Sequence, residues 1–307
     1  SSSAAYRIML SILIPIYNYN AFPLVLELHQ QCIACGIAFE ILCQDDCSTI
    51  NCIENNQITK LQGCQHLSNK KNLGRSSNIN ALVEISKFDY LLILEADAFP
   101  LNKNYIETYI EAIKKKPQAV FGGVIYSESK PEKKKILRWI YGNARESKDL
   151  AKRLKNPHDI VFSWNLLIEK KVFLNNPFDS SITTYGFEDL VFLKNLKEKN
   201  VRIHQIDNPC LHQNEEESAI FIKKSEIAVL NLIELYRKNI LSTSDSNLLR
   251  AFASLKKTHL IATTSFLFDR FEKPMKKNLL SKKPSLFTFD LYRLGYFCKH
   301  AQTKNRS

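Results

Sequence analysis

Three acidic segments and one histidine carry the chemistry that this sequence can do. In chain order they are Asp45-Asp46, Glu95-Ala96-Asp97, Glu188-Asp189 and His212. Carboxylates that lie close together repel one another unless a cation joins them. Mg2+ or Mn2+ commonly bridges such carboxylates to the phosphates of a substrate. The pattern therefore predicts a site for a divalent metal and a phosphate-containing ligand.

Strands must deliver the first two acidic segments, because an apolar run precedes each of them. From Leu10 onward strands and helices alternate along the chain, which predicts an α/β fold with a mainly parallel sheet flanked by helices. Ligands bind at the carboxyl edge of such a sheet, so both segments should meet there. The expected strands are 11–16, 39–43, 65–67, 90–94, 119–124, 160–168 and 201–205. The expected helices are 22–35, 50–60, 75–86, 105–115 and 187–199.

The 307 residues divide into three expected parts. Residues 1–8 are interpreted as a tag or an alternative start, because Met9 directly precedes the first strand. Residues 9–214 form the catalytic domain, and residues 215–307 form a basic helical extension. From Arg250 onward thirteen basic residues face three acidic ones, so this stretch carries +10 of the net +12. Two interpretations of the extension stay open: helices packed on the domain, or peripheral contact with an anionic membrane.

Composition limits the class of protein. With 45% hydrophobic and 24% charged residues the chain is expected to be globular rather than disordered. No apolar run reaches the roughly 18 residues that span a bilayer, and no signal-peptide pattern is present. Of the eight cysteines, Cys32 and Cys35 stand three apart and no second pair has the same spacing, so we expect reduced thiols rather than a zinc site. A cytoplasmic location follows from these features.

Further polar residues are expected to contribute to the ligand site. Pro15, Tyr17 and Asn18 lie at the exit of the first strand, where side chains can meet a ligand. For Asp45, ligand contact and capping of the next helix are equally good interpretations, whereas ligand contact is preferred for Asp46. The glycine turn that opens the helix at 75 suits a phosphate, although a simple loop-to-helix junction explains it equally well. Its candidate residues are Asn72, Arg75 and Asn80.

These segments together resemble family 2 inverting glycosyltransferases of the GT-A fold, over about residues 10 to 215. Segments Ile14-Pro15 to Asn18, Ser163-Trp164-Asn165 and Gly186-Phe187-Glu188-Asp189 join the acidic clusters in the order of that family. The resemblance implies that Asp46 binds the nucleobase and that Asp97 and His212 hold the metal. It implies that Asp189 is the catalytic base and that Glu188 holds a hydroxyl group. It further implies that Asn165 lines the sugar pocket, that Glu95 meets the ribose or a donor hydroxyl, and that Ala96 and Trp164 contact the donor.

The resemblance implies a metal-dependent inverting glycosyltransferase that uses Mn2+ or Mg2+. The expected donor is a nucleoside-diphosphate-sugar, with a UDP-sugar favoured, and the transferred group is a hexose or N-acetylhexosamine. The expected acceptor is a saccharide or a lipid-linked molecule in surface polysaccharide or glycan biosynthesis, at the inner face of the plasma membrane. The Gly186-Phe187-Glu188-Asp189 segment resembles the galactosyltransferase-like subgroup. Because the Gln-any-any-Arg-Trp motif of processive synthases is missing after Asp189, we expect addition of a single sugar.

Two alternatives belong to other classes. A sugar-1-phosphate nucleotidylyltransferase would need a glycine-rich basic loop after the first strand, where Phe22-Pro23 stand instead. A non-catalytic basic membrane-binding module would explain the charge of the tail but would not need the carboxylates. Nucleic acid is not an expected partner, because the tail has few of the interleaved aromatic residues that stack on bases.

Overall fold

The computed structural model describes residues 8–158, 161–213 and 216–302. The chain divides into two compact units. The first comprises Ser1–Tyr126, Glu146–Thr183 and Phe192–Asn214. The second comprises Ser127–Arg145, Thr184–Val191 and Glu215–Ser307. The expected boundary between residues 214 and 215 coincides with a division between the two units, and two internal segments also group with the C-terminal helices. Of residues 1–8, which were interpreted as a tag or an alternative start, the structure describes residue 8 alone.

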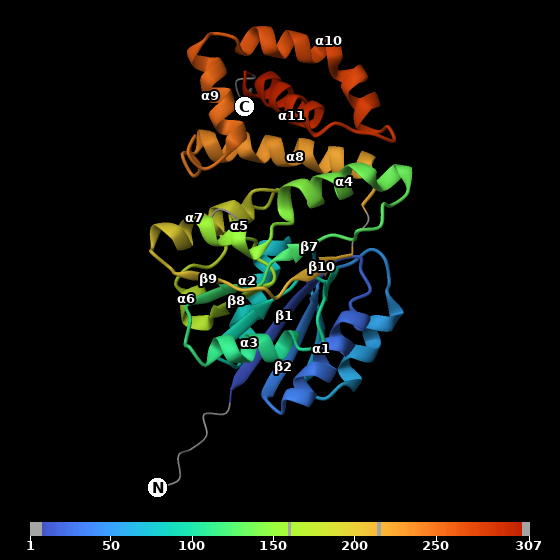
Figure 1. Ribbon diagram of the computed structural model, residues 1–307, viewed down its shortest axis with the longest axis vertical. Helices are drawn as coiled ribbons and strands as arrows, with labels where there is room; N and C mark the ends of the chain where they lie inside the picture. Colours follow the sequence, from blue (N-terminus) through green and yellow to red (C-terminus); the bar gives the residue numbers. More distant parts are fainter. Residues whose placement is uncertain (1–7, 159–160, 214–215, 303–307) are drawn as a thin grey trace. The chain divides into compact units, whose positions relative to one another are not determined.

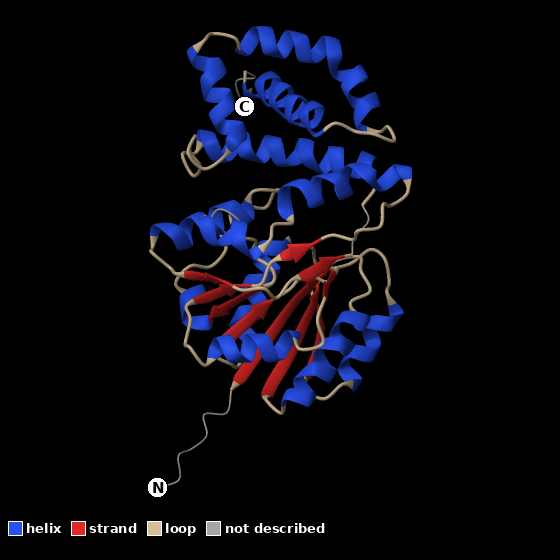
Figure 2. Ribbon diagram, viewed as in Figure 1, coloured by secondary structure: helices blue, strands red, loops and turns tan. Residues whose placement is uncertain are grey.

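A seven-stranded sheet forms the centre of the first unit, in the order β3-β2-β1-β4-β8-β6-β9 (Figures 1 and 2). Strands β1 to β4 are parallel, and β8 runs antiparallel between β4 and β6. The expected α/β fold with a mainly parallel sheet is confirmed. The strands are β1 Met9–Ile16, β2 Ala38–Asp45, β3 Cys64–Ser68, β4 Tyr90–Ile93, β6 Ala119–Phe121, β8 Leu166–Glu169 and β9 Ile203–Gln205.

The register of the parallel strands brings their carboxyl ends to one edge. Ile16 of β1 pairs with Asp45 of β2, and Asp45 pairs with Ser68 of β3. On the other side of β1, Leu13 pairs with Ile93, the last residue of β4. Because β1 is flanked by strands on both sides and covered by helices, its residues Leu10–Ile16 are fully or almost fully buried. The edge at which β1, β2 and β4 end is therefore held on a rigid base.

Helices of the first unit follow most of the expected positions. They are α1 Phe22–Cys35, α2 Arg75–Ile85, α3 Tyr105–Ile113, α5 Leu150–Lys155 and α6 Lys170–Leu174. The segment expected as a helix at 50–60 is a 3-10 helix, Ile53–Lys60. Within it the buried Asn55 binds the backbone of the strand exit, accepting from Ala21 N (2.9 Å) and donating to Tyr19 O (2.9 Å). Tertiary hydrogen bonds therefore shape this segment more than helix propensity does.

Two of the expected strands are shortened at residues with a positive φ. The segment 119–124 is interrupted at Gly122 and Gly123, and the chain resumes as β7 Val124–Ile125. Gly123 has a φ of 97°, and a Cβ on Gly122 would lie 2.4 Å from Asn208 O. Of the segment expected as a strand at 160–168, residue 160 lies outside the described residues, and the strand begins only at Leu166, because Asn165 has a φ of 50°. After the two glycines, β7 belongs to a second sheet, which has the order β5-β10-β7. Its other strands are β5 Ala98–Pro100 and β10 Cys210–His212.

The second unit is helical, as expected for the C-terminal extension. It contains α4 Ile136–Tyr141, α8 Ser218–Arg237, α9 Asn247–Lys257, α10 Ile261–Leu279 and α11 Leu286–Ala301 (Figure 1). A buried cluster that includes Leu137, Ile222, Phe268 and Tyr292 joins α4, α8, α10 and α11. Another helix, α7 Glu188–Glu198, begins in this unit. None of the helices in the described part of the chain has the length and apolarity to cross a membrane.

Candidate active site at the carboxyl edge of the sheet

Asp97 and His212 lie side by side although they are far apart in sequence. Asp97 follows β4, and His212 ends β10, which pairs with β5 directly after Asp97. The distance from His212 Nε2 to Asp97 Oδ2 is 3.7 Å, and both side chains are largely buried. The His212 ring is stacked on Tyr126 at 5.1 Å and contacts Trp164 at 5.9 Å. These aromatic neighbours fix the imidazole beside the carboxylate.

The pair suits a divalent cation in its chemistry and spacing. A carboxylate oxygen and an imidazole nitrogen are both ligands for Mn2+, and two ligands of one ion stand about 3 Å apart. Within 8–158, 161–213 and 216–302, no group of three or more His, Cys, Asp and Glu side chains forms a metal site. An ion held here would thus take its remaining ligands from water and substrate phosphates, which is the usual arrangement for Mg2+.

Glu95, which stands on the same strand exit, is neutralised by Arg75. Arg75 Nε donates to Glu95 Oε1 at 2.5 Å, and its Nη2 donates to Ser163 Oγ at 2.9 Å. The guanidinium also lies over the Phe178 ring, at 5.7 Å from the centroid. Arg75 was expected to meet phosphate and Glu95 a sugar or ribose hydroxyl. The structure adds an ion pair between them, and both ligand contacts stay predictions.

Asp46 holds the loop that leads into α2. The residue is 4% exposed, and its Oδ1 accepts from Asn69 Nδ2 and Leu73 N, both at 2.8 Å. Its Oδ2 accepts from Gly74 N at 2.9 Å. Asn72, at the exposed tip, accepts from Gly74 N at 3.0 Å. The nucleobase contact of Asp46 stays a prediction, whereas its role in holding the loop is observed.

The exits of β1 and β2 are tied to each other. Asn18, with a φ of 51°, accepts from Thr49 N (2.8 Å) and Ile50 N (3.0 Å) through its Oδ1. Asp45 Oδ1 accepts from Ser48 N at 2.8 Å within the loop after β2. The next helix, Ile53–Lys60, has Cys52 as its N-cap, so Asp45 does not cap it, and the ligand contacts of Asp45 and Asn18 stay predictions. Tyr17 is 51% exposed at this edge, and its ligand contact also stays a prediction.

Several expected contact residues are buried or partly buried within the fold. Pro15 is buried within β1, which continues to Ile16 rather than ending at the proline. Asn80 binds the backbone of Phe178: its Nδ2 donates to Phe178 O at 2.9 Å, and its Oδ1 accepts from Phe178 N at 3.1 Å. Ala96 and Trp164 are 8% and 7% exposed. Direct donor contact by the Pro15 side chain is therefore not supported, because it is enclosed by the sheet.

Asn165 needs the clearest correction, since it was expected to line the sugar pocket. It is 0% exposed, and its Oδ1 accepts from Tyr105 Oη (2.5 Å) and Tyr109 Oη (2.7 Å). Its Nδ2 donates to Gly123 O (2.6 Å) and Asn208 O (3.0 Å). The amide has no capacity left for a ligand, so Asn165 holds together the chain segments behind the site.

The structure also shows neighbours of the site that sequence reasoning missed. Tyr126 stacks on His212, Ser163 accepts from Arg75, and Asn69 donates to Asp46. Burial and then the negative charge of Asp97 raise the pKa of Tyr19, so this tyrosine is within electrostatic reach of the Asp97 carboxylate. Asn69 and Tyr126 directly follow β3 and β7, and the rule that strand ends carry ligands could have found them.

Glu188 and Asp189 belong to the second unit, where they open α7. The preceding turn has left-handed residues at Gly186 (φ 97°) and Phe187 (φ 67°). A Cβ on Gly186 would lie 2.4 Å from Ala228 Cβ of α8, so only glycine allows this approach. Asn231 Nδ2 donates to Gly186 O at 2.5 Å and to Thr184 O at 3.1 Å. The turn that aims the two carboxylates is thus anchored on α8.

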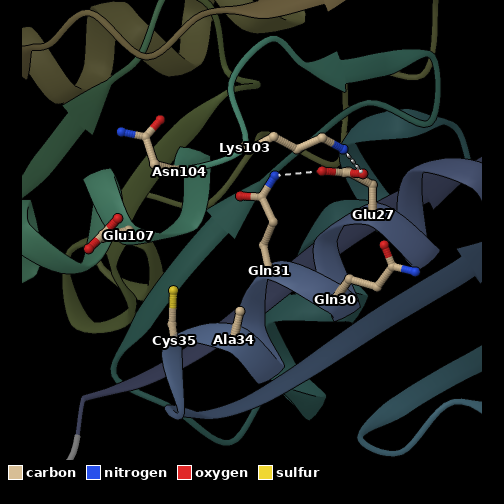
Figure 3. Close-up of a pocket in the computed structure, with 8 residues that line it drawn as sticks. All are labelled: Glu27, Gln30, Gln31, Ala34, Cys35, Lys103, Asn104 and Glu107. Carbon is tan, nitrogen blue, oxygen red and sulfur yellow. Dashed lines mark hydrogen bonds and ion pairs between the residues drawn. The ribbon is translucent and has the colours of Figure 1, made fainter.

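A pocket of about 430 Å³ lies elsewhere in the first unit, between α1 and α3 (Figure 3). Glu27 in it is paired with Lys103 (2.9 Å) and accepts from Gln31 Nε2 (2.8 Å). Gln31 also accepts from Ile106 N at 3.0 Å. These polar groups hold α1 against the start of α3, and none of the expected site residues lines the pocket. We assign the site to the carboxyl edge instead.

Comparison with known proteins agrees with this geometry. A family model described as Glycosyl transferase family 2 matches residues 11–175, more than half of the chain. The chain therefore belongs to glycosyl transferase family 2. This assignment favours a sugar transferase over a nucleotidylyltransferase or a non-catalytic module. No match was found among curated protein sequences.

Solved structures show the same fold at low sequence identity. The mannosyltransferase PcManGT from Pyrobaculum calidifontis, in complex with GDP-Man and Mn2+, matches 97% of this chain and 88% of its own, with 15% identity and a TM-score of 0.57. TarS 1-349 from S. aureus, in complex with UDP-GlcNAc, matches 95% of this chain and 91% of its own, with 13% identity and a TM-score of 0.50. In a longer TarS chain the match spans 40% of that chain. At these identities the similarity shows the fold alone.

Replacing Asn165 with alanine should lower the free energy of unfolding by about 2–4 kcal/mol. Two buried tyrosine hydroxyls would lose their acceptor, and alanine would be strained at a φ of 50°. Urea unfolding followed by circular dichroism measures the change. Asn104→Ala is the matched control, because that side chain is exposed and makes no cap hydrogen bond. Equal midpoints for wild type and Asn165→Ala would show that the buried amide is dispensable.

Proposed function

We propose that this protein is a metal-dependent inverting glycosyltransferase that adds a single sugar from a nucleoside-diphosphate-sugar to its acceptor. The observation that carries the proposal is the Asp97 carboxylate held 3.7 Å from the His212 imidazole at the carboxyl edge of the sheet. Membership of glycosyl transferase family 2 supports the reaction class. The GT-A-like order of strands supports the proposal, because α/β folds bind nucleotides at the carboxyl edge of the sheet, where this pair lies.

Asp97 and His212 would hold Mn2+ or Mg2+. A bound ion would offset the negative charge that develops on the departing diphosphate. The stacking of Tyr126 on His212 keeps the imidazole in place before substrate arrives. The Mn2+ in the PcManGT complex supports this choice of metal.

The nucleotide half of the donor is assigned to the loops after β1, β2 and β3. Tyr17 is exposed there, and Asp46 holds the turn at Gly74. Arg75, on the first turn of α2, is positioned beside the carboxylates by Glu95. A UDP-sugar is the favoured donor, and the UDP-GlcNAc complex of TarS 1-349 supports a nucleotide of this kind. We propose a hexose or an N-acetylhexosamine as the transferred sugar.

Asp189 is assigned as the catalytic base and Glu188 as a group that holds an acceptor or donor hydroxyl. Inversion requires the base to take the proton of the acceptor hydroxyl while that oxygen forms a bond to the anomeric carbon. The bond from that carbon to the diphosphate breaks on the opposite face. The anchored turn at Gly186 supports this role, because a base has to be held in a defined orientation. A helix-capping role for the two acids is the competing explanation.

The acceptor is proposed to be a saccharide or a lipid-linked molecule of surface polysaccharide or glycan biosynthesis. The basic C-terminal helices support a cytoplasmic enzyme that works at the inner face of the plasma membrane.

Removing the metal should abolish transfer. Chelation with EDTA is expected to stop turnover, and added Mn2+ or Mg2+ should restore it. Asp97→Asn should lower kcat/KM by about 100-fold or more at saturating Mn2+, because the variant loses a charged ligand. Release of UDP or GDP from a panel of sugar donors measures turnover. Asp89→Asn, an exposed carboxylate just before β4, is the matched control. Full activity of the EDTA-treated enzyme would contradict metal dependence.

Asp189→Asn should separate chemistry from binding. Turnover is expected to fall by about 100-fold to 10,000-fold, because an amide cannot accept the acceptor proton. The Kd for the donor should stay unchanged, measured by isothermal titration calorimetry. Glu198→Gln, at the exposed far end of α7, serves as the control and should keep wild-type turnover. Wild-type turnover in Asp189→Asn would refute the assignment of the base and would favour the capping explanation.

A further inference from the structure

Exposed phenylalanines are confined to one region of the second unit. The chain has 18 phenylalanines, and 15 of them are buried or partly buried. The three that are exposed are Phe266 (70%), Phe271 (52%) and Phe287 (71%). The first two lie on α10 and the third on α11, drawn in orange and red in Figure 1. Single exposed apolar residues are common, whereas exposed phenylalanines gathered on two helices that pack together indicate a surface that another phase or molecule covers.

The outward side of α10 carries two parallel lines of residues. Its inward side is fixed by Phe268, which is 3% exposed and packs on Tyr292 and Tyr296 of α11. One outward line is apolar and exposed: Leu267, Phe271 and Pro274, at spacings of four and three. The neighbouring line starts with Phe266 and continues with exposed basic residues at the same spacings: Arg270, Lys273 and Lys277. An apolar line beside a basic line is typical of a helix that lies in a membrane interface.

The charge of this surface is positive after its internal ion pairs are counted. Asp269 is paired with Lys299 at 2.6 Å, and Glu272 is paired with Lys276 at 3.0 Å. These are the only acidic residues of α10. Arg270, Lys273 and Lys277 have no acidic partner among the residues the structure describes, and the exposed Lys282 and Lys283 follow in the connection to α11.

We propose that α10 and the beginning of α11 form a docking surface for an anionic lipid bilayer. The apolar residues would enter the boundary between headgroups and acyl chains, and the basic line would contact acidic headgroups. The apolar residues of this α10–α11 surface are Phe266, Leu267, Phe271 and Phe287, and the basic residues are Arg270, Lys273 and Lys277. The inference deepens the proposed work at the inner membrane face, since it identifies the surface and the lipid class.

A second copy of the chain is a poorer occupant than a membrane. In a twofold contact through this surface the basic line of one copy would approach the basic line of the other. Like charges in contact are destabilising, whereas each Lys or Arg near an anionic bilayer is attracted to it. The positive charge of the surface therefore favours an anionic bilayer over a second copy of the chain. Self-association is kept as an outcome that the experiment can detect.

Vesicle flotation of the full chain tests the proposal. Wild-type protein should float with vesicles of phosphatidylcholine and phosphatidylglycerol, should float poorly with phosphatidylcholine alone, and should detach as salt is raised. The double variant Phe266→Ser/Phe271→Ser should bind the anionic vesicles about tenfold more weakly or less. The matched control Ile50→Ser/Ile53→Ser removes two residues of similar exposure, 60% and 66%, from the first unit and should bind like wild type.

Three results would overturn the proposal. One is absence of wild-type binding to the anionic vesicles, and another is equal binding by the wild type and the Phe266→Ser/Phe271→Ser variant. The third is a change of molecular mass in light scattering for that variant, because it would show that the surface joins two copies. Donor turnover with a water-soluble acceptor, measured without vesicles, should be the same in wild type and variant. Loss of vesicle binding with intact turnover thus separates the docking surface from the catalytic proposal.

Discussion

Mutual repulsion of carboxylates at one edge of the sheet is the constraint on which the rest of the structure depends. The register of β1, β2 and β4 fixes where Asp46, Glu95 and Asp97 must emerge. The negative charge of each carboxylate has a different partner: backbone and side-chain amides for Asp46, Arg75 for Glu95, and His212 for Asp97. Hydrogen bonds therefore stabilise the Asp46 carboxylate within the protein, and an ion pair neutralises that of Glu95. Asp97, paired with an imidazole that can itself bind metal, is the position where a cation adds most.

The segments behind the edge are shaped to bring His212 to Asp97. Gly122 and Gly123 interrupt the strand after β6, and Asn165 in its left-handed conformation interrupts the segment before β8. The Asn165 amide then joins Gly123 O and Asn208 O to the hydroxyls of α3. This arrangement lets β10 pair with β5 and places His212 beside the Asp97 carboxylate. A fully buried polar side chain is thus part of how the ligand pair is built.

Local patterns in the sequence were sufficient for the parallel half of the sheet and its edge. The apolar runs before Asp45 and Glu95 predicted their strands, and the parallel-strand rule then brought both to one place. The antiparallel insertion of β8 could not be predicted, because strand pairing depends on contacts between residues distant in sequence. The same limit explains Asn165: its partners Tyr105, Tyr109 and Asn208 are far along the chain, so a sugar-pocket role and a buried role looked alike. Arg75 was recognised as a cation for the site, but its pairing with Glu95 depends on tertiary structure.

Direct titration of the donor with and without a divalent cation tests the central claim most directly. Calorimetry with UDP-sugars and GDP-sugars in the presence of Mn2+ should show one site per chain for at least one nucleotide. The same titration in EDTA should show weaker binding by about tenfold or more, because the diphosphate would then face Asp97 without a cation between them. Equal affinity in Mn2+ and EDTA, or no binding of any nucleotide-sugar, would contradict the account of the carboxylate edge as a metal-assisted donor site.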